Sequence, residues 1–212
     1  MHYVLSILHL YYIWEANLIM KICIFGASSD RLDRFYFDAA YELGKKLAEA
    51  GHSIVFGAGS SGLMGACAKG ALQNGGHVIG IAPTLFNEPG FLLHECSEII
   101  LTSSLAERKE EMMKCSDGII ALPGGIGTMD EFFEAITLKQ LGLISSPLVL
   151  LNTDHFYNPL YDYLCKMADL GFMSENCLRL IRVCDTPEEA LSSVLTPDSL
   201  KGSIRRLQDY SK

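Results

Sequence analysis

The sequence lacks any long run of basic residues. Its 212 residues hold 17 Lys and Arg against 25 Asp and Glu, which gives a formal net charge of −8 at pH 7. Non-specific affinity for nucleic acid comes from basic side chains that neutralise phosphates, and an acidic chain has few to offer. We therefore expect no binding to nucleic acid or to an anionic membrane as the main function.

The chain also lacks the cysteine and histidine spacings of a metal site. Its seven cysteines never form a C-x-x-C pair, which indicates reduced thiols and a cytoplasmic location. The six histidines form no H-E-x-x-H motif, and the compact run His94-Glu95-Cys96 cannot give one ion several ligands without severe bending. We predict no bound metal ion.

No apolar run is long enough to span a membrane. Fifteen of the first twenty residues are apolar or aromatic, but the run ends at Glu15, short of the ~20 residues that a spanning helix needs. No basic segment or A-x-A cleavage site of a signal peptide accompanies it. Because Met20 directly precedes an apolar strand, we predict that the functional chain begins there and that residues 1–19 are an extension or a misassigned start.

From Lys21 onward, short apolar runs alternate with longer segments of helical period. We predict strands at residues 21–25, 53–56, 77–81, 98–101, 118–122, 147–151 and 181–184. We predict helices near residues 34–50, 63–73, 105–115, 128–141, 157–170 and 186–194. The alternation favours an α/β fold, a Rossmann-like doubly wound parallel β-sheet in a single domain over residues 20–196, with a solvated tail at 197–212.

Glycine-rich turns follow three of the predicted strands, at the carboxyl ends where such sheets bind ligands. The first turn, residues 25–30, brings Ser28 and small neighbours to a place where backbone N–H groups approach an anion. An ordinary tight turn capped by Ser or Asp is the alternative.

The second turn, residues 57–62, matches the G-x-G-x-x-G dinucleotide fingerprint. It follows the second strand rather than the first, and the next strand runs into Ala82-Pro83 without the acidic residue that binds the ribose of NAD. The pattern therefore predicts contacts from Gly59, Ser60 and Gly62 to a phosphate or ribose, but not an NAD site.

The third turn carries the most information. Gly124, Gly125 and Gly127 separate a buried strand from a helix that we expect to start near Thr128, so that free N–H groups and the positive end of the helix dipole face one anion. The lysine of a triphosphate P-loop is missing, which disfavours ATP hydrolysis.

Two interpretations of the acidic residues after this turn remain open. Thr128 and Glu131 have the spacing of a capping box, which needs no ligand. Alternatively, Glu131 and Glu134, three residues apart, place two carboxylates beside the anion pocket. A phosphate pocket flanked by carboxylates suits a sugar phosphate.

A basic pair precedes the third turn in the chain. Arg108 and Lys109 open the helix that starts near Leu105, where a solvated helix face is the simple interpretation. At the carboxyl edge of the sheet, however, Arg108 would bind a phosphate through its planar fork or orient Glu131.

Two of these motifs together resemble a known family. Pro123-Gly-Gly-Ile-Gly-Thr-Met-Asp-Glu131 and Leu105-Ala-Glu-Arg108-Lys109 are similar to the signatures of the cytokinin riboside 5′-monophosphate phosphoribohydrolase (LOG) family, often labelled lysine decarboxylase-like. The resemblance includes Gly62-Leu-Met-Gly65 and Gln140-Leu-Gly142. Leu105 replaces a family methionine, and since apolar volume is kept we expect binding to survive.

The resemblance implies a Rossmann-like homodimer that hydrolyses a nucleoside 5′-monophosphate to free base and ribose 5-phosphate. It implies catalytic roles for Arg108 and Glu131, and substrate contacts from the glycine turn and Thr128. No lysine stands where pyridoxal phosphate would form a Schiff base, so we predict no cofactor. AMP and a prenylated adenine nucleotide both remain candidate substrates, and a non-catalytic carrier of a phosphorylated ligand, like the molybdenum-cofactor carriers, is the alternative function.

Overall fold

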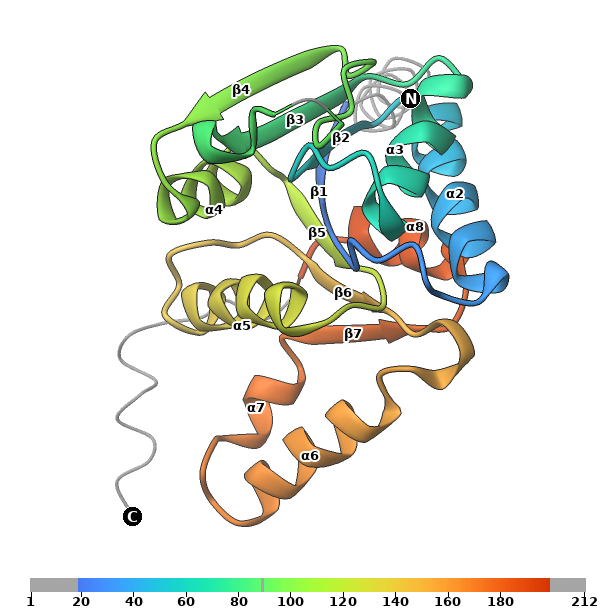
Figure 1. The fold of residues 1–212 in the computed structure, drawn as a ribbon. Coiled ribbons are helices and arrows are strands. Elements are labelled where there is room, and N and C mark those ends of the chain that lie inside the picture. The colour runs from blue at the N-terminus through green and yellow to red at the C-terminus, as the bar shows by residue number, and fades with distance from the viewer. Residues whose placement is uncertain (1–18, 89, 199–212) are drawn as a thin grey trace, which may run out of the picture.

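The computed structural model describes residues 19–88 and 90–198 (Figure 1). Its seven strands form one sheet in the order β4-β3-β2-β1-β5-β6-β7, with every neighbouring pair parallel. The strands are β1 (Lys21–Phe25), β2 (Ser53–Phe56), β3 (Val78–Pro83), β4 (Glu98–Thr102), β5 (Gly118–Ala121), β6 (Leu148–Leu151) and β7 (Ile181–Cys184). The predicted Rossmann-like α/β fold in a single domain is confirmed.

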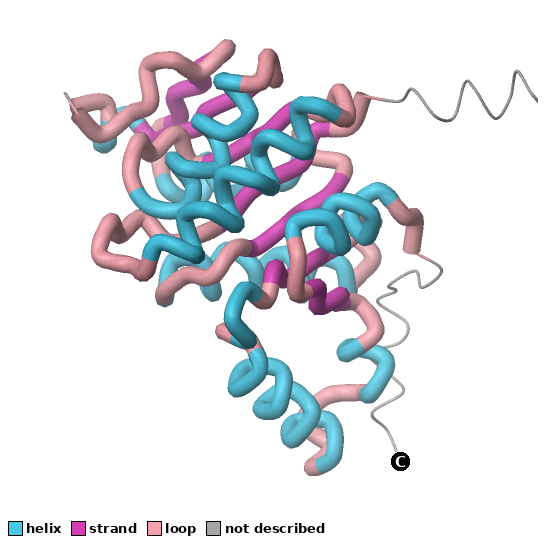
Figure 2. The backbone as a smooth tube through the Cα atoms, turned by 90° about the vertical axis from the view of Figure 1, so that its right-hand side faces the viewer, coloured by secondary structure: helices cyan, strands magenta, loops and turns pink. Residues whose placement is uncertain are grey.

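Helices cover both faces of this sheet (Figures 1 and 2). One face carries α2 (Arg34–Glu49), α3 (Gly62–Gln73) and α8 (Pro187–Leu195), and the other carries α4 (Leu105–Lys114), α5 (Ile126–Gln140), α6 (Asn158–Asp169) and α7 (Glu175–Leu178). Alternate residues of each strand enter the two cores: Ile22 and Ile24 pack on the α2 side, whereas Cys23 and Phe25 pack on the α5 side. Burial on both faces explains why the central strands are continuously apolar.

The order of the strands fixes where a ligand can enter. The chain runs from β1 outward through β2 and β3 to β4, and then returns to place β5 on the other side of β1. Such a reversal opens a crevice beyond the carboxyl ends of the two central strands. The turns after β1, β2 and β5 therefore meet at one edge of the sheet.

The predicted elements lie within two residues of those observed. The largest difference at the site is α5, which begins at Ile126 rather than near Thr128. The short helix α7 and two 3₁₀ turns, η1 (Thr84–Phe86) and η2 (Thr153–His155), were not predicted, because elements of three or four residues are too short to show a period. Within the described ranges, none of the helices is long and apolar enough to cross a membrane.

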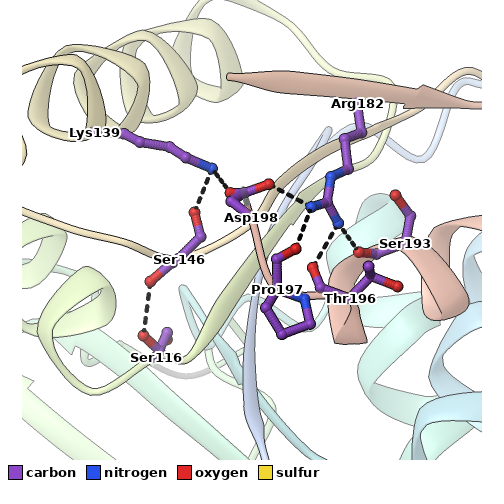
Figure 3. A network of polar contacts seen from close by, with 8 residues as sticks. All are labelled: Ser116, Lys139, Ser146, Arg182, Ser193, Thr196, Pro197 and Asp198. Atoms are coloured by element: carbon purple, nitrogen blue, oxygen red, sulfur yellow. Dashed lines mark hydrogen bonds and ion pairs between the residues drawn. The ribbon is translucent and has the colours of Figure 1, made fainter. Parts of the chain in front are cut away.

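A buried polar network holds the chain beyond α8 (Figure 3). Asp198 forms ion pairs with both Lys139 and Arg182, and Lys139 Nζ also donates to the carbonyl oxygen of Ser146 at 2.8 Å. Burial lowers the pKa of Lys139, while Asp198 acts against that shift. Arg182 donates to the carbonyl oxygen of Thr196 at 2.7 Å. The boundary predicted after residue 196 thus falls inside a bonded segment, and residues 199–212 and 1–18 lie outside the described part.

Candidate functional site

A cavity of about 480 Å³ lies at the carboxyl ends of β1, β2 and β5. The turns after these three strands meet helix α4 and the start of α5 there. The cavity is lined by Gly26, Ala27, Ser28, Gly57, Gly59, Met64, Phe86, Phe91, Leu92, Leu105, Arg108, Gly125, Ile126, Gly127, Thr128 and Glu131. A hollow of about 780 Å³ between α2 and α3 is larger, but Arg108 and Glu131 do not line it.

An ion pair between two helices stands at the polar end of the cavity. Ser104 caps α4 by accepting the N–H of Glu107, and Arg108 follows in the first turns of that helix. Its Nη2 donates to Oε1 of Glu131 on α5, and the two side chains are 13% and 9% exposed. The structure therefore joins the two residues that the family resemblance names as catalytic.

Burial and charge act in opposite directions on Glu131. Removal of the carboxylate from water raises its pKa above the ordinary value, and the positive charge and hydrogen bond of Arg108 partly oppose that rise. Nε of Arg108 is buried and has no hydrogen-bond partner in the described part of the chain. On the other side of the guanidinium, a Cβ on Gly57 would stand only 3.0 Å from Nη1, so a glycine keeps room for the arginine there.

The glycine turn after β5 presents backbone donors to the same cavity. The first backbone hydrogen bond of α5 runs from Met129 N–H to the carbonyl oxygen of the N-cap residue Gly125, so the preceding N–H groups have no intrahelical acceptor. Gly125 and Gly127 line the cavity. Gly124 serves packing instead, because a Cβ there would stand 2.1 Å from Oγ1 of Thr128.

The capping-box interpretation of Thr128 and Glu131 is wrong. Gly125 is the N-cap of α5, so Thr128 and Glu131 lie inside the helix, and both are buried. Glu131 directs its carboxylate to Arg108 rather than to a backbone N–H. The Thr-x-x-Glu spacing therefore does not mark the start of this helix.

Eight of the thirteen predicted site residues line the cavity. They are Ser28, Gly59, Leu105, Arg108, Gly125, Gly127, Thr128 and Glu131. The other five, Ser60, Gly62, Lys109, Gly124 and Glu134, lie outside its lining.

The residues outside the cavity have other partners. Gly62 has a positive φ of 66°, donates its N–H to Asp30 Oδ1 at 2.8 Å, and with Ser60 lines the larger hollow. Lys109 Nζ pairs with Asp130 at 2.8 Å and with Glu134 at 2.6 Å. Glu134 also lines a separate hollow of about 690 Å³ between α4 and α5, which Glu131 does not line. The i to i+3 spacing alone did not distinguish these two sides of α5.

Sequence reasoning missed the apolar end of the cavity. Phe86 and Phe91 stack there with ring centroids 5.8 Å apart and ring planes within 4°. Ser60 N–H bonds to the carbonyl oxygen of Phe91 at 3.0 Å, and Leu93 N–H to that of Ala58 at 2.8 Å, so the turn after β2 holds this wall in place. Two phenylalanines shortly after β3 were the only sequence feature that could have indicated this wall. An irregular segment has no periodic pattern, so the sequence does not show that it belongs to a site.

Fold and cavity together define the class: a Rossmann-like α/β protein in which a glycine-rich turn lies beside a buried Arg–Glu pair. The family model described as "Possible lysine decarboxylase" matches residues 64–194. The cytokinin riboside 5′-monophosphate phosphoribohydrolase LOG of Oryza sativa subsp. japonica is 39% identical over 169 residues, which cover 80% of this chain and 70% of that protein. LOG2 of Arabidopsis thaliana, with the same enzyme name, is 40% identical over 161 residues, 76% of each chain. This chain belongs to the LOG family.

Solved structures with the same fold include molybdenum-cofactor proteins. The carrier protein from Chlamydomonas reinhardtii has a TM-score of 0.65 at 25% identity and covers 84% of this chain and 96% of its own. The molybdenum cofactor binding protein from Rippkaea orientalis has a TM-score of 0.65 at 22% identity, covering 83% and 95%. The second likeness shows the fold alone.

Proposed function

We propose that this protein is a nucleoside 5′-monophosphate phosphoribohydrolase, which cleaves the N-glycosidic bond and releases free base and ribose 5-phosphate. The observation that carries the proposal is the buried Arg108–Glu131 pair in one cavity with the glycine turn. A carrier of a phosphorylated ligand needs such a turn, but it does not need a buried carboxylate whose charge a neighbouring arginine stabilises. The enzyme names of the relatives favour the same activity.

In this proposal the 5′-phosphate binds at the N-terminus of α5. The N–H groups of Ile126, Gly127 and Thr128 precede the first intrahelical bond and are available to phosphate oxygens. The helix dipole adds a partial positive charge at the same place. Backbone donors thus give an acidic protein a local anion site.

In the proposed reaction, Glu131 is the residue that acts at the bond between ribose and base. As the bond between ribose C1′ and the base nitrogen breaks, the base takes the electron pair and positive charge develops on the sugar, which a nearby carboxylate stabilises. A water oxygen bonds to C1′, Glu131 accepts a proton from that water, and the leaving base takes up a proton. Arg108 holds Glu131 in place and favours its ionised form. The reaction consumes only water.

The base would occupy the apolar end of the cavity. Met64, Leu92 and the Phe86–Phe91 pair offer apolar surface and an aromatic face there. Adenine stacks on such a face, and an apolar substituent on its N6 atom would bury further surface against the same wall. AMP and an N6-prenylated AMP are therefore the two substrates to compare.

We also propose a cytoplasmic homodimer. Leu105, Ile126 and Leu143 are apolar and exposed on and beside α4 and α5, and Ile126 is 90% exposed. A second copy that covered this surface would bury it and would lie next to the cavity, of which Leu105 and Ile126 are already part. Light scattering of the purified protein measures the predicted mass of two chains.

Chromatography of reaction mixtures tests the proposed activity. Purified protein is incubated with AMP, N6-prenylated AMP and, as a control without phosphate, adenosine. We expect free base and ribose 5-phosphate from at least one nucleotide and little base from adenosine. Retained nucleotide binding with no base release from any nucleoside monophosphate would support the carrier function instead.

A further inference from the structure

Tyr157 lies behind the glycine turn without lining the cavity. Its ring is buried, and its hydroxyl donates to the carbonyl oxygen of Leu122 at 2.6 Å, immediately before Pro123 and the glycines. The tyrosine comes from the loop after β6, whereas Leu122 follows β5. A side chain from a third strand end is therefore bonded to the base of the turn.

The Tyr157 hydroxyl gives the Leu122 carbonyl a hydrogen bond that the sheet does not make. Pairing of β5 with β6 ends at Ala121 and Leu150, and the N–H of Asn152 belongs to the β6–β7 ladder, where it bonds to the carbonyl oxygen of Cys184 at 2.7 Å. The Leu122 carbonyl is thus left beyond the ladder, in a buried position where a polar group needs a partner. Tyr157 supplies the donor.

The loop that delivers Tyr157 is itself held firmly. Oδ1 of Asn152 accepts the N–H of Tyr157 at 2.7 Å, and Nδ2 of Asn152 donates to Asp185 at 2.8 Å. Asp154 and His155 adopt positive φ angles of 53° and 58°, a conformation that costs free energy in residues other than glycine. The fold tolerates this cost in the segment that brings Tyr157 under the turn.

Leu122 links Tyr157 to the donors of the proposed phosphate site. Its N–H bonds to Phe25 at 2.8 Å, and the next carbonyl, that of Pro123, accepts the N–H of Ala27 at 3.1 Å. The turns after β1 and β5 are thereby fixed to each other, and Tyr157 fixes them both to the loop after β6. A shift at Leu122 would move Gly125 and Gly127, which line the cavity only three and five residues later.

We propose that Tyr157 is a positioning residue for phosphate binding, which acts by holding the Leu122 carbonyl and with it the backbone donors of the glycine turn. The inference rests on the proposed function, in which that turn binds the 5′-phosphate. Tyr157 does not touch the substrate.

The test is Tyr157→Phe, which removes the hydroxyl and keeps the ring. We expect the KM for AMP and the Kd for ribose 5-phosphate to rise about ten-fold, the factor for loss of one buried hydrogen bond. The inhibition constant of free adenine, which binds at the other end of the cavity, should stay unchanged. A merely structural role would lower the amount of folded enzyme and hence kcat, and would leave all three constants alone.

Tyr163→Phe is the matched control, because this tyrosine on α6 is 59% exposed and does not line the cavity. Asn152→Ala is a second variant, which leaves the hydroxyl but frees the Tyr157 N–H; it should raise the same two constants by a smaller factor. If Tyr157→Phe does not fold, the two constants measured with Asn152→Ala test the proposal instead. Unchanged affinity for ribose 5-phosphate in the folded variants would overturn the proposal.

The binding measurement separates this proposal from the proposed activity. If the wild-type protein binds ribose 5-phosphate but releases no base, the activity is wrong, and a weaker Kd in Tyr157→Phe still supports the positioning role. If the wild-type protein does not bind ribose 5-phosphate at all, there is no phosphate site to position and the inference is wrong as well.

Discussion

Glu131 shows at the scale of one residue how the fold prepares a carboxylate for chemistry. Burial disfavours its charge, and Arg108, bonded to the same carboxyl group, restores part of that loss. A carboxyl group with a raised pKa accepts a proton from water more readily than an exposed glutamate does. The sequence motifs identified both Arg108 and Glu131 as candidates. Their burial and mutual contact, however, depend on the packing of α4 and α5 at one edge of the sheet.

The raised pKa of Glu131 predicts the acid limb of the pH profile. Because the ionised form acts in the proposed reaction, kcat/KM should fall as the pH drops through a value above 4.5, the ordinary pKa of this group. The sign for stability is opposite: the contribution of Glu131 decreases as the pH rises from its unfolded pKa through the raised folded one.

The measurement is kcat/KM against pH. The substrate phosphate also titrates, with a second pKa of about 6. The pH dependence of ribose 5-phosphate binding isolates that contribution. After this correction, an acid limb at or below pH 4.5 would contradict the assigned role of Glu131.

At the scale of elements, the sequence predicted the strands and helices that have a periodic apolar pattern and missed the irregular segments. The strands and long helices have clear periods, and so their positions follow from the apolar pattern. The start of α5 was misplaced by two residues because Gly125 caps the helix where the Thr-x-x-Glu pattern suggested Thr128. The Phe86–Phe91 wall depends on a bridge between Gly59 and Leu92, a contact between distant segments that no local pattern contains.

This wall predicts a change of specificity. Phe91→Ala should reduce kcat/KM for N6-prenylated AMP relative to AMP by about ten-fold, because the apolar substituent loses its packing partner. Leu85→Ala is the matched control: Leu85 lies in η1, is 71% exposed and does not line the cavity. An unchanged ratio in Phe91→Ala would mean that the substituent, if bound, lies elsewhere.

At the scale of the whole molecule, buried ion pairs join the segment after α8 to the rest of the described fold. Asp198 is held between Lys139 of α5 and Arg182 of β7, so the segment after α8 is joined to both (Figure 3). The sequence predicted a solvated tail here, since a single aspartate after a proline carries no sign of burial. Its partners lie 16 and 59 residues away in the chain.

These ion pairs of Asp198 predict that one substitution has a large effect on the free energy of unfolding. Asp198→Asn should lower the free energy of unfolding by about 3–5 kcal/mol, because it leaves the buried Lys139 charge without its partner. Urea unfolding measures the loss, with Asp162→Asn on the exposed side of α6 as the control. A change within about 0.5 kcal/mol would place Asp198 among ordinary surface residues.

Base release by Glu131→Gln tests the central claim most directly. The amide keeps the size of the side chain but can neither accept the proton nor stabilise the developing charge, so kcat should fall by about 10³-fold. Glu110→Gln on α4, an exposed glutamate outside the cavity, should retain full activity. We expect Glu131→Gln to remain folded and to bind the nucleotide while releasing almost no base; release at the wild-type rate would contradict the account.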